Sequence, residues 1–291
     1  MRHSRYDILL KVVECGSFSA AAEQLGYTQS AISQTIAALE QELGVTLLVR
    51  NKKGTRLSTD GRACLPHIRE ICDGENALRD RVAAILGGVS GHIRIGTFTS
   101  VSCHFLPGVI RTFQKEHPAI TFQLLQGDYA QIEGWLLEGA VDIGFCRLPM
   151  TAKLDTVSLC KERMMAVLPV DHPLAGMPAV PEKYLERERL ILLEEGSRDD
   201  ASDFLRKRHI TQKAGFRVGD DYTVMAFAEA GIGVGLLPEG VLRRSPYRIA
   251  ARPVAPLYCR ELGVACRDKN HLPAAARLFV EELYRQLAAL E

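Results

Sequence analysis

The spacing of apolar residues from residue 5 to residue 57 predicts three short helices followed by a two-stranded wing. Residues 5–14 carry an apolar stripe typical of a helix. Residues 18–39 read FSAAAEQLGYTQSAISQTIAAL, in which Ser19 and Thr28 are suited to cap helices and Gly26 to end one. Residues 45–57, VTLLVRNKKGTRL, predict two strands that turn at Gly54. The expected unit is therefore a helix, a helix-turn-helix and a wing.

The second helix of this helix-turn-helix has two different faces. At 100° per residue, Ile32, Ile36 and Leu39 share an apolar face, which predicts packing. The opposite face carries short or amide side chains, namely Gln29, Ser30, Ser33, Gln34 and Ala37. Such a face fits into the major groove, where Gln pairs with adenine and Ser with several bases. Taken alone, the stretch also fits an ordinary Ala-rich helical hairpin.

The basic residues that follow favour DNA binding over that alternative. A charge cluster is usually just a solvated surface, but this one comes directly after a helix suited to reading bases, where a wing holds phosphates. The candidate DNA-binding residues are Ser19, Thr28, Gln29, Ser30, Ser33, Gln34, Arg50, Lys52, Lys53 and Arg56.

A long helix is predicted from residue 59, with Thr59 as its cap. Cys64, Ile68, Ile71, Glu75, Leu78, Val82 and Ile85 are separated alternately by four and three residues, the pattern of a coiled-coil seam. This seam predicts a homodimer, although burial against the chain's own domain is the alternative. Two heads on a two-fold axis would read an operator with inverted symmetry. Glycines at 87, 88 and 91 predict a hinge.

Beyond Gly91, predicted strands alternate with predicted helices, which indicates a parallel α/β sheet. A second set of such elements begins near Met164, and late elements return to the first set. We therefore expect an α/β fold class with a winged helix-turn-helix over residues 1–59, a linker and dimerisation helix over 60–90, and a two-lobed effector-binding domain over 91–291. Lobe I is expected to comprise residues 91–161 and 266–291, and lobe II residues 162–265.

The N-terminal residues resemble the DNA-binding domain of LysR-type transcriptional regulators. The matching pattern is GSFSAAA at 16–22, QSAIS at 29–33, Leu39-Glu40, Leu43-Gly44, Arg50 and LST at 57–59. DHPL at 171–174 and AGIGVGLLP at 230–238 extend the resemblance to the rest of the chain. Two positions depart from the family pattern: Leu48 replaces the common Phe, and Gln34 replaces the frequent Arg, which leaves the operator sequence open.

This resemblance implies several further properties. The fold of the effector domain is expected to be similar to that of periplasmic solute-binding proteins, with a small-molecule effector in the cleft between the lobes. The resemblance also implies a dimer of dimers that bends double-stranded promoter DNA, contact with RNA polymerase, activation of a divergent target gene and repression of the chain's own gene.

The cleft of such a domain lies at the carboxyl ends of its strands, where polar residues follow each predicted strand. Free backbone N–H groups at a helix start favour an anion, so we expect a small anionic effector such as a carboxylate. The candidates are Thr99, Ser100, Ser102, Gln126, Arg147, Ser197 and Thr223. Helix capping alone is the competing explanation for Thr99 and Ser100.

Composition and cysteine spacing bear on where the protein acts and on whether it binds a metal or a cofactor. The chain has 291 residues, a net charge of +1 and no apolar run long enough to cross a bilayer, so we expect a cytoplasmic, nucleoid-associated protein without a membrane partner. Its eight cysteines form no CxxC pair, and Cys64, His67 and Cys72 lack a second ligand pair, so we expect neither a metal nor a cofactor. A peroxide sensor of this family would need two cysteines in mid-domain, and residues 161–258 contain none.

An enzyme is the alternative class of function. Glu194, Glu195, Asp199, Asp200 and His104 could supply an acid and a base, but no nucleophile stands at a recognisable spacing from a base. The glycines at 231, 233 and 235 follow a helix and precede a strand, the reverse of the dinucleotide-binding order. The sequence therefore favours a regulator that binds DNA and performs no catalysis.

Overall fold

The computed structural model describes residues 3–51, 54–85, 90–194, 196, 199–211 and 214–288, and the chain divides into two compact units, Met1–Gly87 and Gly88–Glu291. Among the described residues, no helix is both long enough and apolar enough to span a membrane.

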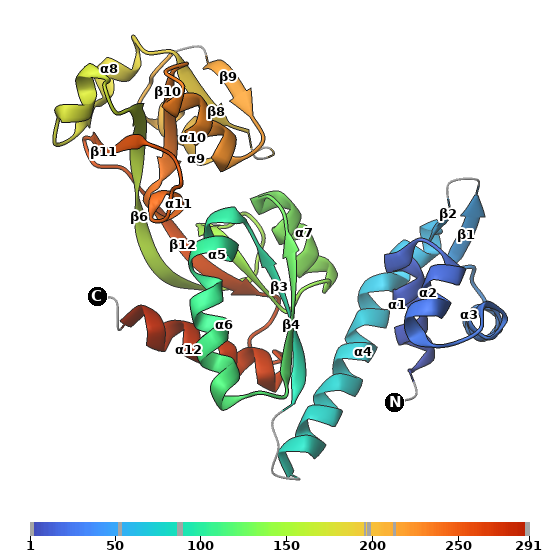
Figure 1. Cartoon of the computed structure of the whole chain (residues 1–291). Coiled ribbons are helices and arrows are strands. Elements are labelled where there is room, and N and C mark those ends of the chain that lie inside the picture. The colour runs from blue at the N-terminus through green and yellow to red at the C-terminus, as the bar shows by residue number, and fades with distance from the viewer. Residues whose placement is uncertain are drawn as a thin grey trace. The chain divides into compact units, whose positions relative to one another are not determined.

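The N-terminal unit packs helices and a small antiparallel sheet around one apolar core (Figure 1). Leu9, Ile32 and Leu39 are fully buried there, so the apolar face predicted for the second helix of the helix-turn-helix is the packed face. The elements of this unit are α1 (Arg5–Cys15), α2 (Phe18–Leu25), α3 (Gln29–Leu43), β1 (Leu48–Asn51), β2 (Gly54–Leu57) and α4 (Thr59–Ile85).

Side-chain caps and a glycine set the geometry of the helix-turn-helix. Thr28 caps α3 as predicted, since its hydroxyl accepts a hydrogen bond from the Ala31 backbone N–H at 3.2 Å. The prediction of Ser19 as the cap of α2 was wrong: Ser17 is the cap, because the helix already begins at Phe18. Gly26 ends α2 with a φ of 70°, a left-handed conformation that glycine adopts without steric cost.

The long helix α4 starts one residue away from the predicted cap. The Ser58 hydroxyl, not that of Thr59, accepts the Gly61 N–H at 2.8 Å, so Ser58 caps the helix and Thr59 is its first residue. The first half of α4 packs on the rest of the N-terminal unit through Leu65, Ile68 and Cys72, which are all buried.

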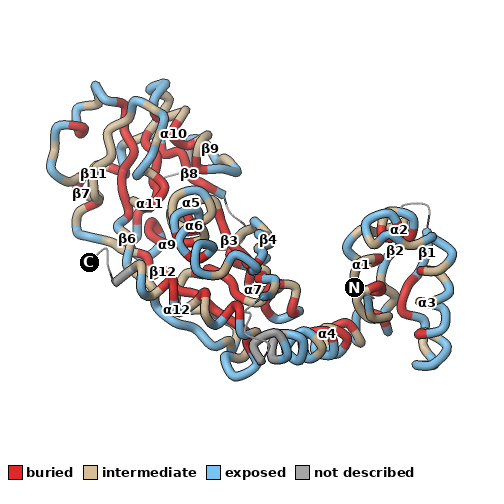
Figure 2. The backbone as a smooth tube through the Cα atoms, turned by 60° about the horizontal axis from the view of Figure 1, so that its bottom comes forward, coloured by how far each residue is buried: buried red, intermediate tan, exposed pale blue. Residues whose placement is uncertain are grey.

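The second half of α4 exposes apolar side chains. Ile71, Leu78 and Val82 are 43%, 66% and 47% exposed, although all three belong to the predicted seam. Figure 2 shows the corresponding change along α4 from buried to exposed residues. Among the described residues of the N-terminal unit, nothing covers this half of the seam.

The C-terminal unit alternates strands and helices as predicted. Its elements are β3 (Gly91–Thr97), α5 (Thr99–His104), α6 (Leu106–Glu116), β4 (Ile120–Gln126), α7 (Tyr129–Glu138), β5 (Ile143–Leu148), β6 (Asp155–Pro169), the 3-10 helix η1 (Pro173–Gly176), β7 (Val180–Pro181), α8 (Glu182–Leu185), β8 (Leu190–Leu193), α9 (Asp200–Lys207), β9 (Ala214–Val218), α10 (Asp221–Glu229), β10 (Val234–Pro238), α11 (Glu239–Leu242), β11 (Ile249–Ala255), β12 (Cys259–Cys266) and α12 (Ala274–Ala288).

These elements form two lobes with separate apolar cores. In lobe I, β3 pairs in parallel with β4 and β5, and the core beneath the helices includes Phe145 and Phe279. In lobe II, β10, β8 and β9 pair in parallel, and the core includes Phe204 and Met225. The predicted βαβαβ arrangement of the first set is confirmed.

Two long antiparallel strands, β6 and β12, connect the lobes (Figure 1). Residues 164–169 of β6 pair with β10 and β11 of lobe II, whereas residues 261–265 of β12 pair with β5 of lobe I. In β12, pairing with β5 begins at Glu261, whereas the sequence places the return to lobe I at 265/266. In β6, pairing with β10 begins at Met164, close to the expected division after residue 161.

The helix that the sequence predicts over residues 105–115 is present as α6, and a separate short helix, α5, precedes it. The structure has α5 before Phe105 and α6 after it, with Pro107 in the first turn of α6. Because proline lacks an N–H and fixes its φ, it favours the start of a new helix over the continuation of α5.

Candidate DNA-binding surface and effector cleft

Helix α3 presents a polar face without long charged side chains. Gln29, Ser30 and Gln34 are exposed, as is Ala37, and Ser33 is half-buried. These residues extend from the first turn along one side of α3, opposite the buried Ile32 and Ile36. This is the face that the sequence predicts for contact with base edges, and short side chains let the helix backbone lie deep in a groove.

The wing is tied to this face by Arg50. Its guanidinium lies over the Phe18 ring, with the carbon 4.0 Å from the ring centroid, and Nη2 donates to the Ser33 hydroxyl at 3.1 Å. Arg56, on the neighbouring strand, is exposed. Arg50 therefore holds the wing against α3 and also brings a positive charge beside the reading face.

For four of the predicted DNA-contacting residues, Ser19, Thr28, Lys52 and Lys53, the structure gives less direct support. Ser19 is exposed in α2 and makes no cap, whereas the hydroxyl of Thr28 is used by the cap of α3. Lys52 and Lys53 lie outside the described residues.

In the C-terminal unit, α5 brings several of the predicted effector residues together. The Thr99 hydroxyl accepts a hydrogen bond from the Gln126 amide at 2.9 Å, which joins the ends of β3 and β4. Ser100 is buried, and its hydroxyl accepts from Arg260 at 3.0 Å. Ser102 instead donates back to the Thr99 carbonyl at 3.2 Å, so its hydroxyl is used within α5.

Arg147 joins the two lobes at the same cleft. From the end of β5 in lobe I, it donates to Asp200 at 3.0 Å and makes a second ion pair with Asp203, both on α9 of lobe II. Thr223 does not line the cleft cavity, because its hydroxyl donates to Asp220 at 2.6 Å in the cap of α10. The predicted Ser197 lies outside the described residues.

The central group of the cleft, Arg260, was not among the sequence candidates. Its guanidinium donates to Glu162 at 2.6 and 2.8 Å, to Asp200 at 2.8 Å, to the Tyr129 hydroxyl at 2.9 Å and to Ser100 at 3.0 Å. All five of its N–H donors are therefore occupied. The alternation of buried residues in β12 is the signal that could have found it, since Arg260 falls on the same face as Leu262 and Val264.

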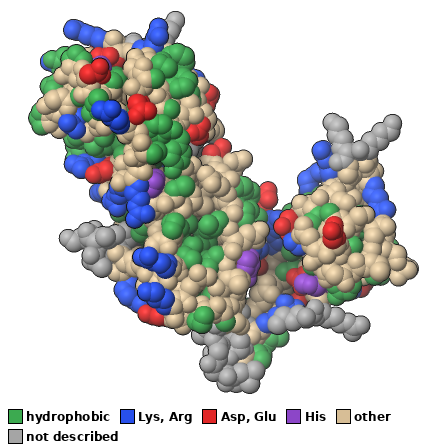
Figure 3. All heavy atoms as spheres, viewed as in Figure 1, with side chains coloured by type: hydrophobic (Ala, Val, Ile, Leu, Met, Phe, Trp, Pro, Cys, Tyr) green, Lys and Arg blue, Asp and Glu red, His purple; other side chains and the backbone are tan. Residues whose placement is uncertain are grey.

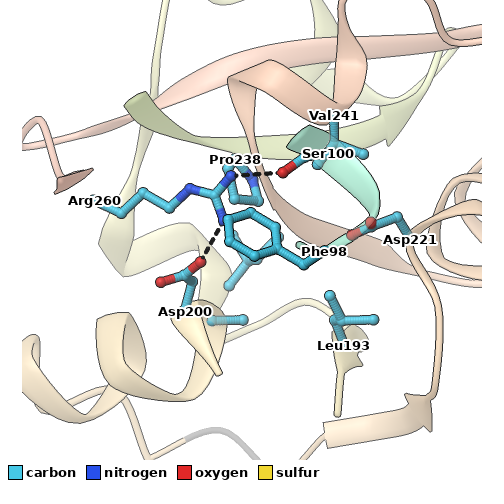
Figure 4. Close-up of a pocket in the computed structure, with 10 residues that line it drawn as sticks. Phe98, Ser100, Leu193, Asp200, Asp221, Pro238, Val241 and Arg260 are labelled. Atoms are coloured by element: carbon cyan, nitrogen blue, oxygen red, sulfur yellow. Dashed lines mark hydrogen bonds and ion pairs between the residues drawn. The ribbon is translucent and has the colours of Figure 1, made fainter. Parts of the chain in front are cut away.

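The cleft is closed around this guanidinium (Figure 4). The cavity that remains measures only about 20 Å³ and is lined by Phe98, Ser100 and Asp221 together with apolar residues of lobe II. Such a volume accommodates about one water molecule. In this arrangement, the ion pairs of Arg147 and Arg260 with Asp200 hold the lobes together.

The carboxyl groups in the cleft differ in their electrostatic environment. Burial would raise the pKa of Asp200, but Arg260 and Arg147 outweigh that effect and lower it, so Asp200 is ionised. Burial raises the pKa of Asp221 to about 6, and among the described residues its side chain has no hydrogen-bond partner. Figure 4 shows Asp221 pointing toward the same cavity as Ser100.

The acidic residues considered for catalysis do not form an acid–base pair in the described part of the chain. Asp199 caps α9 through the Ser202 N–H at 2.6 Å, and Asp200 is held by two arginines. Glu194 is exposed, while Glu195 lies outside the described residues. His104 lies on α5, where it lines a separate cavity.

None of the eight cysteines, all of which lie in described residues, forms a disulfide, and at least two have inert thiols. Burial raises the pKa values of Cys72 and Cys146 to about 12, which keeps both thiols protonated. Across the described ranges, no group of three or more His, Cys, Asp or Glu side chains is arranged to hold a metal ion.

Comparison with known proteins agrees with this architecture over nearly the whole chain. Residues 4–62 match the family model "Bacterial regulatory helix-turn-helix protein, lysR family", and residues 86–288 match "LysR substrate binding domain". The chain is 31% identical to the "Uncharacterized HTH-type transcriptional regulator YvbU" of Bacillus subtilis, covering 97% of each protein. It is 32% identical to the "Probable hydrogen peroxide-inducible genes activator" of Mycobacterium leprae, covering 96% of this chain and 89% of that protein.

Solved structures share the fold. A full-length OxyR variant from Pseudomonas aeruginosa has a TM-score of 0.76 at 21% identity, covering 97% of this chain and 96% of that one. CbnR in complex with its target DNA has a TM-score of 0.67 at 24% identity, covering 98% and 99%. The helix-turn-helix with its polar reading face, the long helix and the two-lobed domain thus occur together in one known family, and the chain belongs to it as a LysR-type transcriptional regulator with a helix-turn-helix DNA-binding domain and an effector-binding domain.

Proposed function

We propose that α3 reads base edges in the major groove of an operator while the wing holds the adjacent backbone. Gln29, Ser30 and Gln34 are the base-reading residues, supported by their exposure on one face. Arg50 and Arg56 contact phosphates, and Lys52 and Lys53 are assigned the same role from the sequence. Arg50 also transmits the position of the wing to α3 through its bond to Ser33.

The exposed half of α4 forms the seam of a homodimer. Ile71, Leu78 and Val82 are apolar and exposed at coiled-coil spacing, so a second copy would bury them. Two such dimers assemble on the promoter as a dimer of dimers, which places pairs of reading helices on symmetric half-sites. The regulator acts in the cytoplasm on nucleoid DNA, contacts RNA polymerase, performs no catalysis, and both activates a target gene and represses its own.

The effector is a small anion that binds between the lobes. The observation that supports this proposal is the carboxylate of Asp200, which already occupies the position between two guanidiniums, those of Arg147 and Arg260. An effector carboxylate with Ser100 and Thr99 beside it would compete with Asp200 for those arginines and release lobe II. Such a ligand shifts the arrangement of the lobes only by as much as it prefers one arrangement over the other.

Binding of carboxylates to the full-length protein tests this proposal. A thermal-shift screen with a panel of small mono- and dicarboxylates is expected to give at least one hit. The Asp200→Asn variant should bind that hit more tightly, because the internal competitor has lost its charge, and Ser100→Ala should bind it more weakly. A panel that stabilises neither wild type nor Asp200→Asn would refute an anion in this cleft.

Binding to DNA is tested with the chain's own upstream region. The protein is expected to retard this fragment in a gel at a salt concentration where a scrambled fragment stays free. Equal affinity for the two fragments would contradict specific reading by α3.

A further inference from the structure

Asp221 is a buried carboxylate without a counter-charge in the closed cleft. It is 3% exposed, lines the small cavity beside Ser100 and, among the described residues, makes no hydrogen bond or ion pair through its side chain. Burial raises its pKa to about 6, so the group is still ionised at pH 7.5. A buried charge in this state is unfavourable, and a ligand that supplies the missing donor would relieve the cost.

The start of α10 does not account for this carboxylate. Asp220 caps the helix, since its side chain accepts the Thr223 backbone N–H at 2.8 Å and the Thr223 hydroxyl at 2.6 Å. An acidic residue in the first turn gains from the helix dipole, but the raised pKa of Asp221 means that burial outweighs that gain. The helix therefore uses Asp220 and leaves the carboxylate of Asp221 facing the cavity (Figure 4).

The ion-pair cluster at the cleft contains more carboxylates than buried guanidiniums. Among the described residues, the two guanidiniums of Arg147 and Arg260 meet three paired carboxylates, and the cavity adds a fourth: Glu162, Asp200, Asp203 and Asp221. Arg206 also pairs with Asp203, but its side chain is 75% exposed and water screens its charge. A purely anionic ligand would add to the negative excess, whereas a ligand that also carries a positive group would not.

The cavity beside Asp221 has the size of an ammonium group. Its volume of about 20 Å³ accommodates one water molecule, and an ammonium group is of similar size. Asp221, Ser100 and Arg260 all line it, so a cation and an anion of one small ligand would each meet an opposite charge there. Figure 3 shows acidic and basic side chains together on the outer face of lobe II, where water solvates them. Asp221 differs from those surface acids because it is enclosed.

We propose that the effector is an amino acid, whose ammonium group pairs with Asp221 while its carboxylate replaces Asp200 on Arg147 and Arg260. This inference rests on the proposed function, because the carboxylate still competes with Asp200. Asp221 is then the residue that selects a zwitterion over a simple carboxylate. The Ser100 hydroxyl lies beside both charged groups and fixes the orientation of the ligand.

Compounds that differ only in the amino group test this inference on the full-length protein. The common L-amino acids are screened by thermal shift, and the one that stabilises most is compared by titration calorimetry with its 2-hydroxy acid and its deaminated acid. The amino acid is expected to bind about tenfold more tightly than either, as is typical of one charge-assisted hydrogen bond. Equal or tighter binding of the deaminated acid, or stabilisation by no amino acid, would overturn the inference.

Failure of this inference is distinguishable from failure of the proposed anion site. If simple carboxylates bind and amino acids bind no better, the anion site stands and the role of Asp221 is wrong. If neither class of compound stabilises the wild type or Asp200→Asn, both the anion site and the amino acid are refuted.

Two adjacent acids provide the variant and its matched control. Asp221→Asn should bring the amino acid and its deaminated acid to similar affinity, and it should stay folded because it removes a buried charge that has no partner among the described residues. Asp220→Asn makes the same change of charge one residue earlier, keeps an acceptor for the cap of α10, and should retain the preference for the amino acid. An unchanged preference in Asp221→Asn would overturn the inference.

Discussion

At the scale of single residues, register decides which charged groups meet. Arg260 lies directly opposite Glu162 in the pairing of β12 with β6, which places the two side chains on the same face of the ribbon. The sequence shows that both residues are charged. It cannot show that they form an ion pair, because that depends on the register between two strands about 100 residues apart. By contrast, the positions of Ser100 and Arg147 were predictable, because Ser100 lies in the first turn of the helix after β3 and Arg147 lies at the end of β5, and the local pattern identifies both strands.

Asp221 provides a residue-scale prediction about stability. Its pKa in the folded state, about 6, exceeds the ordinary value of 3.8 because of burial, with Asp220 and Asp200 adding to the shift and Arg260 opposing it. Folding therefore bears the cost of burying this charge above pH 6, and bears none below about pH 4, where the group is protonated in both states. Asp221→Asn should raise the free energy of unfolding by about 1–3 kcal/mol at pH 7.5.

Denaturant titrations at several pH values check this prediction. The stability of the wild type relative to Asp221→Asn should fall as the pH rises from 4 to 6 and then level off. A difference that is constant between pH 4 and pH 7.5 would mean that the carboxyl group titrates normally in the folded protein.

At the scale of elements, the helix-turn-helix was predictable and its exact caps were not. The buried face of α3 follows from helical periodicity alone. The choice between Ser17 and Ser19, or between Ser58 and Thr59, depends on where the preceding turn leaves the chain, and neighbouring hydroxyls are chemically equivalent candidates. Pro107, in the first turn of α6, likewise marks where a new helix starts directly after α5.

The reading face and the wing should respond differently to substitution. Gln29→Ala removes a base-contacting amide and should reduce discrimination between operator and mutated operator by about 1–3 kcal/mol. Arg56→Ala removes a phosphate contact and should weaken all DNA alike, reducing the salt slope by about 1. Fluorescence anisotropy on an operator selected from a randomised library measures both, and an equal loss of discrimination in the two variants would contradict this division.

The seam of α4 supports a prediction about assembly. Leu78 is 66% exposed in the isolated chain, so Leu78→Asp should leave the monomer folded while placing a charge inside the dimer seam. Sedimentation velocity should then show monomers. Asn76→Asp is a suitable control, since residue 76 lies outside the seam positions, and it should remain dimeric. A Leu78→Asp variant with unchanged sedimentation would exclude this half of α4 from the interface.

At the scale of the whole molecule, the family and the two-lobed domain were identifiable from the sequence, whereas the state of the cleft was not. Whether lobes are open or closed depends on a few long-range ion pairs, such as Arg147 with Asp200 and Asp203, that have no local sequence signature. The cavity beside His104, about 520 Å³ in volume, is also a product of tertiary packing, since its walls come from five separate segments of the effector domain. Similarity to a peroxide-inducible activator does not transfer its chemistry, because residues 161–258 contain no cysteine.

The two strands that connect the lobes pair with each other from Asp155 to Arg163 on β6 and from Cys259 to Cys266 on β12. Two independent linkers would let one lobe twist or slide freely relative to the other. Two hydrogen-bonded strands cannot move independently, so they bend together as one unit. It bends easily across its flat face and resists both shear and rotation within its plane. The lobes of this regulator should therefore open along one preferred direction, so that different ligands alter how far the domain opens more readily than the path along which it moves.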